Sequence, residues 1–167
     1  SLPGTARTLF RHLLSTLEQD HGAELVEFCL SAIVLSRSGL SSAAMHDLCE
    51  AHVWRYDQIS SFSRIREALG VFLTAGGGFG LLQFFHDQLA VECKARYQLN
   101  SARAKRLYTE MADHFSLIRS HRGYWDEFFY SVHSHDFTRA DDTLGKLSQV
   151  TDTVSGDGAV GRVADLI

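Results

Sequence analysis

The chain has one proline, Pro3, and three cysteines among its 167 residues. Since no proline follows Pro3 to interrupt a helix, the composition favours a mostly helical protein. The odd number of scattered cysteines, Cys29, Cys49 and Cys93, is typical of free thiols in a reducing compartment rather than of a disulfide framework. No signal peptide and no apolar run long enough to span a bilayer are visible, so we expect a cytoplasmic protein without a membrane partner.

A basic excess is also missing. The 16 Lys and Arg residues are outnumbered by 20 Asp and Glu residues, which gives a formal net charge of −4. Nucleic-acid-binding domains usually carry a basic surplus or stripe, so this balance argues against a nucleic-acid partner. Hydrophobic residues make up 45% of the chain. That content is enough for the core of one sizeable domain, or of a small domain with an appendage.

The chain lacks the residues that nucleotide hydrolysis requires. Residues 76–80 form a glycine cluster, but no lysine follows as a P-loop requires, and Leu81 stands where a dinucleotide-binding fingerprint has its third glycine. The pair Asp141 and Asp142 lacks the apolar strand that precedes a Walker B acid. We therefore expect no enzyme activity, no catalytic residue and no cofactor in this chain. The glycine cluster is interpreted as the tip of a hairpin.

Apolar residues recur at helical spacing in four segments before the glycine cluster. These predicted helices cover about residues 5–20, 23–36, 43–52 and, starting at Ser61 or Ser63, the segment to about 73. A tight turn at 38–41 gives a helix-turn-helix, and the glycine tip with a return strand at 81–85 gives a short hairpin. A helix-turn-helix followed by a hairpin is a winged helix. The predicted fold class is thus mostly α, a winged helix with a short β-hairpin wing, followed by an α-helical extension.

We expect three regions along the chain. They are a linker at 1–5, a winged-helix domain with its following helix at 6–120, and the start of a helical, repeat-like region at 121–167. Two short helices at about 123–129 and 136–140 open the last region, and a flexible loop is expected near 150–161. One residue from each of four apolar stripes is predicted to lie in the core, namely Ile33, Phe72, Leu89 and Phe115.

The segment 81–97 changes its period from strand to helix. Its apolar run gives way to residues that recur every four positions, namely Phe85, Leu89, Cys93 and Tyr97. His86 therefore lies where a strand turns directly into a helix. The first helical turn carries unpaired N–H groups and a partial positive charge. A histidine there is placed to donate to an anion such as a phosphate, or else it simply caps or packs at the helix start.

The residues at this junction resemble a signature found in the winged-helix segment of STAND-class NTPases. They are Phe84, Phe85, His86, Asp87, Gln88 and Leu89, followed by Tyr97. The family includes NACHT proteins carrying WD or TPR repeats, NLR immune receptors and apoptosome-forming proteins. Ala90 and Val91 stand where NLR receptors have a Gln-Glu pair, and the acid comes later, at Glu92. The resemblance, which covers about residues 6–147, is therefore closer to the repeat-bearing NACHT proteins.

The resemblance implies that His86 reaches the β-phosphate of bound ADP and holds the parent protein closed. The chain would then be a regulatory arm that contacts the ADP-bound nucleotide domain upstream of it and controls opening and oligomerisation. ADP or ATP, a downstream repeat domain and a homo-oligomeric active parent are implied in the same way. The alternative is a winged helix that binds nucleic acid. The third predicted helix, at 43–52, has no Arg or Lys with which to contact phosphates.

Two other groups of residues are candidates for binding. A basic grouping around the next helix junction could bind an acidic partner or nucleic acid, although such residues more often form a solvated face. It comprises Lys94, Arg96, Arg103, Lys105 and Arg106. His46, Cys49 and His52 have the residue types of metal ligands, but at a spacing of three on one helix the outer two side chains diverge. No fourth ligand is evident nearby, so we expect no metal site.

Overall fold

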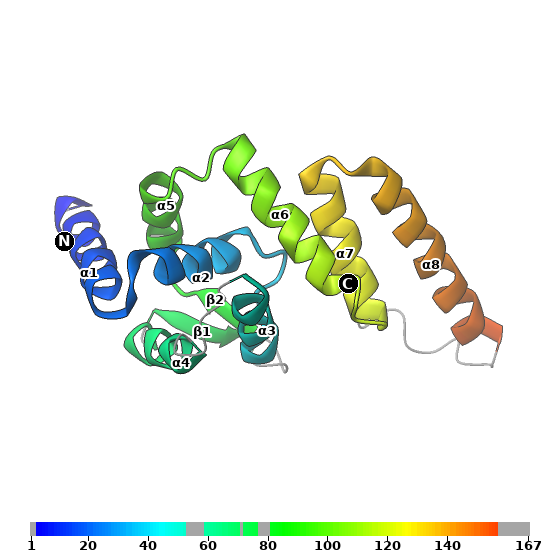
Figure 1. Cartoon of the computed structure of the whole chain (residues 1–167), viewed down its shortest axis with the longest axis horizontal. Coiled ribbons are helices and arrows are strands. Elements are labelled where there is room, and N and C mark those ends of the chain that lie inside the picture. Colours follow the sequence, from blue (N-terminus) through cyan, green and yellow to red (C-terminus); the bar gives the residue numbers. More distant parts are fainter. Residues whose placement is uncertain (1–2, 53–58, 71, 77–80, 157–167) are drawn as a thin grey trace. The chain divides into compact units, whose positions relative to one another are not determined.

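A computed structural model describes residues 3–52, 59–70, 72–76 and 81–156 (Figure 1). These residues are mostly helical, which confirms the class predicted from composition. The chain divides into two compact units, Ser1–Ala104 and Lys105–Ile167. The division thus falls near residue 104, whereas the sequence pattern places it after residue 120.

The first unit contains α1 (Pro3–His21), α2 (Ala23–Leu35), α3 (Ser42–His52), α4 (Ile59–Ala68), β1 (Leu73–Gly76), β2 (Leu81–Phe84) and α5 (Asp87–Arg96). The helix α1 begins at Pro3 and so includes residues expected in the linker, because the fixed φ of proline suits the first turn of a helix. The apolar helix α2 is central to this unit. It contacts α1, α3, α4, α5 and β2 (Figure 1).

Backbone hydrogen bonds connect the turn between α2 and α3 to the strand β2. The Leu82 N–H donates to the Leu40 carbonyl at 2.8 Å, and the Leu40 N–H donates to the Leu82 carbonyl at 3.3 Å. Gly39 has φ +87°, and a Cβ at this position would lie 2.8 Å from the Leu82 carbonyl oxygen, so this close approach favours glycine. Ser41 then caps α3, its Oγ accepting from the Ala44 N–H at 3.0 Å.

The two strands form an antiparallel pair, with Leu73 opposite Phe84 and Gly76 opposite Leu81. This agrees with the short hairpin expected from the sequence. The tip was expected at 76–80, but Gly76 belongs to β1, and residues 77–80 lie outside the described part of the chain. The wing, and with it the assignment of this unit to the winged-helix class, therefore stays a prediction.

The helix before the hairpin is shorter than its apolar stripe predicts. α4 ends at Ala68, and Gly70 donates to the Glu67 carbonyl in a turn from which Leu73 enters β1. The apolar residues that continue the helical spacing thus belong to a turn and a strand. Phe72 lies in this turn and is half-buried, so its prediction as a core residue is wrong.

The described residues of the second unit form α6 (Ser101–Phe115), whose first turn belongs to the first unit, α7 (His121–Ser134) and α8 (Phe137–Gly156). α7 and α8 lie side by side (Figure 1). The prediction of two short helices is wrong, because both segments are long. α8 buries Ala140, Thr143 and Leu147, and packing of such a stripe stabilises a helix whose polar sequence does not favour one by itself.

The prediction of a flexible loop near 150–161 is also wrong for its first half, since α8 continues to Gly156. Residues 157–161 lie outside the described part of the chain. Among the four predicted core positions, Ile33, Leu89 and Phe115 are confirmed, with exposed fractions of 5%, 0% and 6%. None of the helices that the structure describes combines the length and apolar character needed to cross a bilayer.

Candidate functional site

The strand-to-helix junction predicted at His86 is present. β2 ends at Phe84, α5 begins at Asp87, and His86 occupies the N-cap with an extended backbone, φ −114° and ψ 118°. Its carbonyl accepts from the Leu89 N–H at 3.0 Å, while its side chain makes no capping hydrogen bond. The imidazole is exposed. It is therefore accessible at the end of α5 where the helix dipole is positive.

Two phenylalanines lie beside this imidazole. The ring of Phe85 meets it edge-on with 4.7 Å between centroids, and the ring of Phe10 from α1 lies 6.2 Å away. Phe10 is buried and packs edge-on against Phe72, whereas Phe85 is 63% exposed. Phe85 therefore does not continue the buried stripe of α5, contrary to the predicted spacing, because it precedes the helix. It forms an exposed aromatic surface next to His86.

Glu92, whose position departs from the NLR pattern, has a structural role that sequence reasoning missed. Its carboxylate is 3% exposed and accepts from two arginines of α1, from Arg7 Nε at 2.6 Å and from Arg11 Nε at 3.1 Å. Burial opposes ionisation, but the two hydrogen bonds outweigh it and lower the pKa of Glu92. Glu92 lies three residues after the buried Leu89, so an acid within the apolar stripe was the available signal.

A second contact between α1 and α5 lies near the end of α5. Arg96 donates to both carboxylate oxygens of Glu18, at 2.7 and 2.5 Å, and to Ser15 Oγ at 3.0 Å. The hydrogen bond from Arg96 lowers the pKa of Glu18. Burial raises the pKa of neighbouring Tyr97 and raises that of Cys93 to about 12. Ionic and apolar contacts together thus fix α5, the helix whose N-cap is His86, against α1.

The basic grouping predicted from the sequence is partly engaged inside the first unit. Arg96 is paired with Glu18, and Arg103 is paired with Glu27 of α2. Lys94 also belongs to this unit, whereas Lys105 and Arg106 belong to the second unit. Two of the five cations therefore have intramolecular acidic partners, which reduces the charge that this grouping can offer to another molecule.

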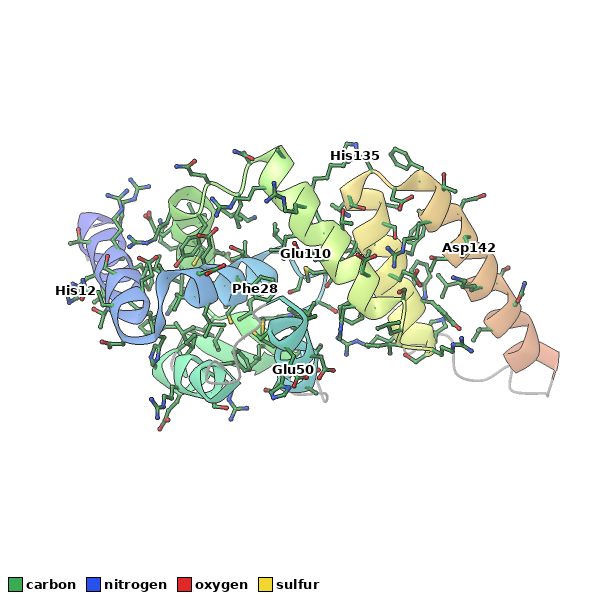
Figure 2. All side chains as sticks on the ribbon, viewed as in Figure 1. His12, Phe28, Glu50, Glu110, His135 and Asp142 are labelled. Carbon is green, nitrogen blue, oxygen red and sulfur yellow. The ribbon has the colours of Figure 1, made fainter. Side chains whose placement is uncertain are left out.

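Of the three residues that suggested metal ligands on α3, one faces the core. Cys49 is buried and faces Cys29 of α2, with 3.5 Å between the sulfur atoms. The side chain of His52 lies outside the described atoms. A different trio on the same helix has its potential ligand atoms within 4.8 Å of one another, namely His46, Asp47 and Glu50. The latter two are exposed (Figure 2 labels Glu50), and such surface acids are common without a metal.

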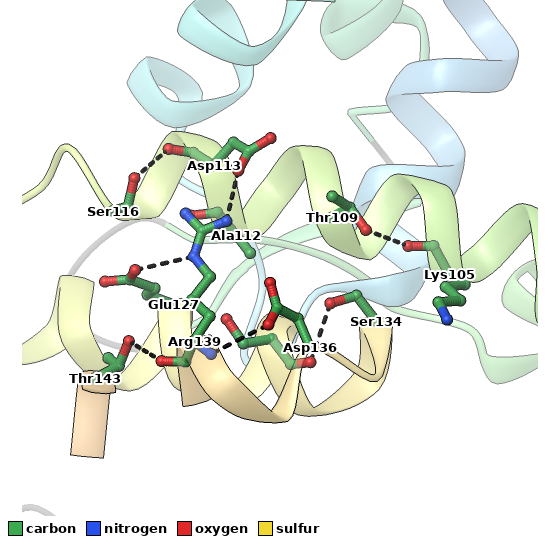
Figure 3. Close-up of polar contacts among 11 residues, drawn as sticks. Lys105, Thr109, Ala112, Asp113, Ser116, Glu127, Ser134, Asp136, Arg139 and Thr143 are labelled. Atoms are coloured by element: carbon green, nitrogen blue, oxygen red, sulfur yellow. Dashed lines mark hydrogen bonds and ion pairs between the residues drawn. The ribbon is translucent and has the colours of Figure 1, made fainter. Parts of the chain in front are cut away.

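The second unit is organised around Arg139 of α8 (Figure 3). Its guanidinium donates to Glu127 at 3.1 Å, to Asp113 at 2.5 Å and to the Ala112 carbonyl at 2.9 Å. Glu127 is 3% exposed in its side chain, so Arg139 supplies the counter-charge for a buried acid on α7. The Asp141–Asp142 pair is exposed on α8, and Asp142 pairs with Lys146. That pair is a solvated helix face, as the sequence indicates.

The human protein "NACHT domain- and WD repeat-containing protein 1" is 35% identical to this chain over 133 residues, which cover 69% of this chain and 8% of that protein. Over 46 residues, 28% of this chain, the identity to telomerase protein component 1 is 44% in Mus musculus and 41% in Rattus norvegicus. That segment is 2% of each telomerase protein. No family model and no solved structure matches the chain. The chain is thus similar to a small part of much longer proteins.

Proposed function

We propose that this chain is a regulatory arm of a STAND-class, NACHT-type signalling ATPase, and that His86 contacts the ADP phosphate in the closed parent protein. The observation that carries the proposal is the exposed imidazole at the first turn of α5. The similarity to a human protein named for its NACHT domain supports the same class. A winged-helix first unit, an active homo-oligomer and a repeat domain downstream belong to this proposal.

The chemistry suits an arm that senses phosphate without hydrolysing it. The helix terminus offers a partial positive charge and the imidazole offers an N–H donor, both of which favour an anion. A hydrogen bond to a charged acceptor contributes about 1.5–3 kcal/mol. A contact of this size biases a closed-to-open equilibrium, and exchange of ADP would release the arm and expose an oligomerisation surface.

The arrangement of α5 supports this role because the helix is held against α1. Glu92 and Arg96 lie on successive turns of α5, and both pair with side chains of α1. Phe10 of α1 also lies beside the imidazole. A donor on a fixed element loses less conformational entropy on binding than one on a free loop, so these contacts favour His86 as a sensor.

The experiment is the substitution His86→Ala in the full-length parent protein, with ADP affinity measured by calorimetry. We expect the affinity to fall about ten- to a hundredfold, at about 1.4 kcal/mol per decade. The melting temperature should barely change, because His86 is exposed. His12→Ala is the matched control, since His12 is an exposed histidine on α1 of the same unit (Figure 2). It should leave both quantities unchanged.

Unchanged ADP affinity in His86→Ala would contradict the sensor role. The sensor role would also be contradicted if His86→Ala lowered the melting temperature and His12→Ala reduced ADP affinity by the same factor. The affinity would then respond to general destabilisation of the unit. His86→Gln sharpens the result, because an amide retains a donor at a similar reach. We expect it to recover part of the lost affinity.

The nucleic-acid alternative has little support from the described residues of α3. That helix carries no Lys or Arg, and its exposed face includes Asp47 and Glu50. A titration of the chain with mixed-sequence duplex at low salt should show no salt-sensitive binding. Such binding would favour the alternative. Likewise, tight ATP binding by this chain alone would contradict the expectation that it has no nucleotide-hydrolysing site of its own.

A further inference from the structure

Two cysteines from different helices meet in the core of the first unit. Sγ of Cys29, on α2, lies 3.5 Å from Sγ of Cys49, on α3. Their exposed fractions are 0% and 3%. A disulfide bond has a sulfur–sulfur distance of about 2.0 Å, so a modest approach of the two side chains would form one. All three cysteines are free thiols in the structure.

We propose that Cys29 and Cys49 form a reversible disulfide in the folded chain when a peroxide is present, and that this bond crosslinks α2 to α3. The residues are twenty positions apart and belong to helices that already pack together. The crosslink therefore closes a loop between elements that the fold has brought into contact.

The reaction balances with hydrogen peroxide as the two-electron oxidant. The Cys49 thiolate attacks one peroxide oxygen, the O–O bond breaks, and a sulfenic acid forms while the other oxygen leaves as hydroxide and takes up the thiol proton to give water. Sγ of Cys29 then attacks the sulfenic sulfur, the S–O bond breaks, and a second water leaves. Both sulfurs are oxidised by one electron each. A thiol reductant restores them.

The order of the two steps follows from the surroundings of the sulfurs. The hydrogen bond with Cys49 and burial raise the pKa of Cys29, whereas the same hydrogen bond lowers the pKa of Cys49. Cys49 is also the less completely buried of the two. The thiolate, which is the reactive form, is therefore favoured at Cys49.

The closed loop contains the turn that holds β2. Leu40 lies between the two cysteines in sequence and exchanges backbone hydrogen bonds with Leu82. A crosslink restricts the unfolded chain and the opening of α2 from α3, so it should stabilise this pairing. The strand β2 leads within two residues to His86. The crosslink thus acts on the support of the junction without contacting it.

The third cysteine is an internal reference. Cys93 is buried in α5, and burial raises its pKa to about 12, so its thiolate is scarce. The chain is treated with hydrogen peroxide, quenched, and its thiols are counted in denaturant. The count should fall from three to one per chain. The intact mass should show the loss of two hydrogens, and a digest should contain a peptide that joins Cys29 to Cys49.

Matched variants separate this bond from other oxidation. Cys93→Ala should form the crosslink as the parent does, whereas Cys29→Ala and Cys49→Ala should not. The oxidised parent should melt at a higher temperature than the reduced parent, and dithiothreitol should reverse the shift. The proposal is overturned if the thiol count stays at three, if oxygen is added without crosslinking, or if the joined peptide contains Cys93 or comes from two chains. The parent's digest decides the question even if an alanine variant fails to fold.

Discussion

Removing both arginines that face Glu92 tests how α5 is anchored. In the Arg7→Ala/Arg11→Ala double variant, a carboxylate that is 3% exposed keeps its burial and loses both partners. Breaking a fully buried ion pair by removing one side costs about 3–5 kcal/mol. The guanidinium side chains are 54% and 60% exposed, so water already screens the pair. We therefore expect a loss of about 2–4 kcal/mol in the free energy of unfolding near pH 7.

The loss should depend on pH with a defined sign. The pKa of Glu92 lies below its ordinary value of 4.5 in the folded parent, so the parent gains stability from this group above that value. The gain disappears as the pH falls through the folded pKa. In the double variant, burial acts without compensation and raises the pKa of Glu92, so protonation relieves the cost. The difference between parent and variant should therefore shrink as the pH falls to about 4.

Urea denaturation followed by circular dichroism, near pH 7 and at about pH 4, measures the difference in stability. Because the chain has two units, hydrogen exchange should assign the loss to α1 and α5. Arg64→Ala is the control, since Arg64 is an exposed arginine of the same unit. A double variant as stable as this control, or a loss that does not shrink at low pH, would refute the anchoring role of Glu92.

Two further substitutions test the packing of each unit. Leu89→Ala should lower the free energy of unfolding by about 2–5 kcal/mol because Leu89 is fully buried, whereas Phe85→Ala should have little effect on a side chain that is 63% exposed; equal melting curves for the two variants would contradict this. Arg139→Ala should cost about 2–4 kcal/mol by leaving the Glu127 carboxylate without its counter-charge. Arg139→Lys should restore only part of the loss, because a lysine cannot contact Glu127, Asp113 and a carbonyl in one plane; full restoration in urea denaturation would be the contrary result.

Local features of the first unit could be predicted because their causes are local. The change from strand to helix at His86 follows from apolar spacing, and the tight turn at 38–41 follows from a glycine between serines. The central position of α2 follows from its apolar circumference. Each of these signals depends on residues within one or two turns of one another, which is the range over which sequence patterns are informative.

Two secondary-structure predictions are wrong where the local sequence pattern does not match the structure. The apolar stripe before Leu73 continues at helical spacing, but Gly70 and pairing with β2 divert the chain into a strand. The polar sequence of α8 resembles a loop from residue 150 onward, yet the helix continues to Gly156 in a unit where α7 packs along it. At Leu73, pairing with a second strand outweighed local propensity. A single sequence contains no direct measure of such pairing.

Glu92 shows the same limit at the candidate site and connects it to the rest of the unit. Its partner Arg7 lies 85 positions away in sequence, so no local pattern could assign the pair. The strand-to-helix junction at His86 can thus be predicted from the sequence, whereas the ion pairs that hold α5 against α1 cannot. A phosphate contact at His86 can favour the closed state of the parent protein only if α5 is held in a fixed position relative to the rest of the unit. The contacts of Glu92 and Arg96 with α1 provide that connection, so weakening them should reduce ADP affinity in the parent protein even though neither side chain belongs to the proposed phosphate contact.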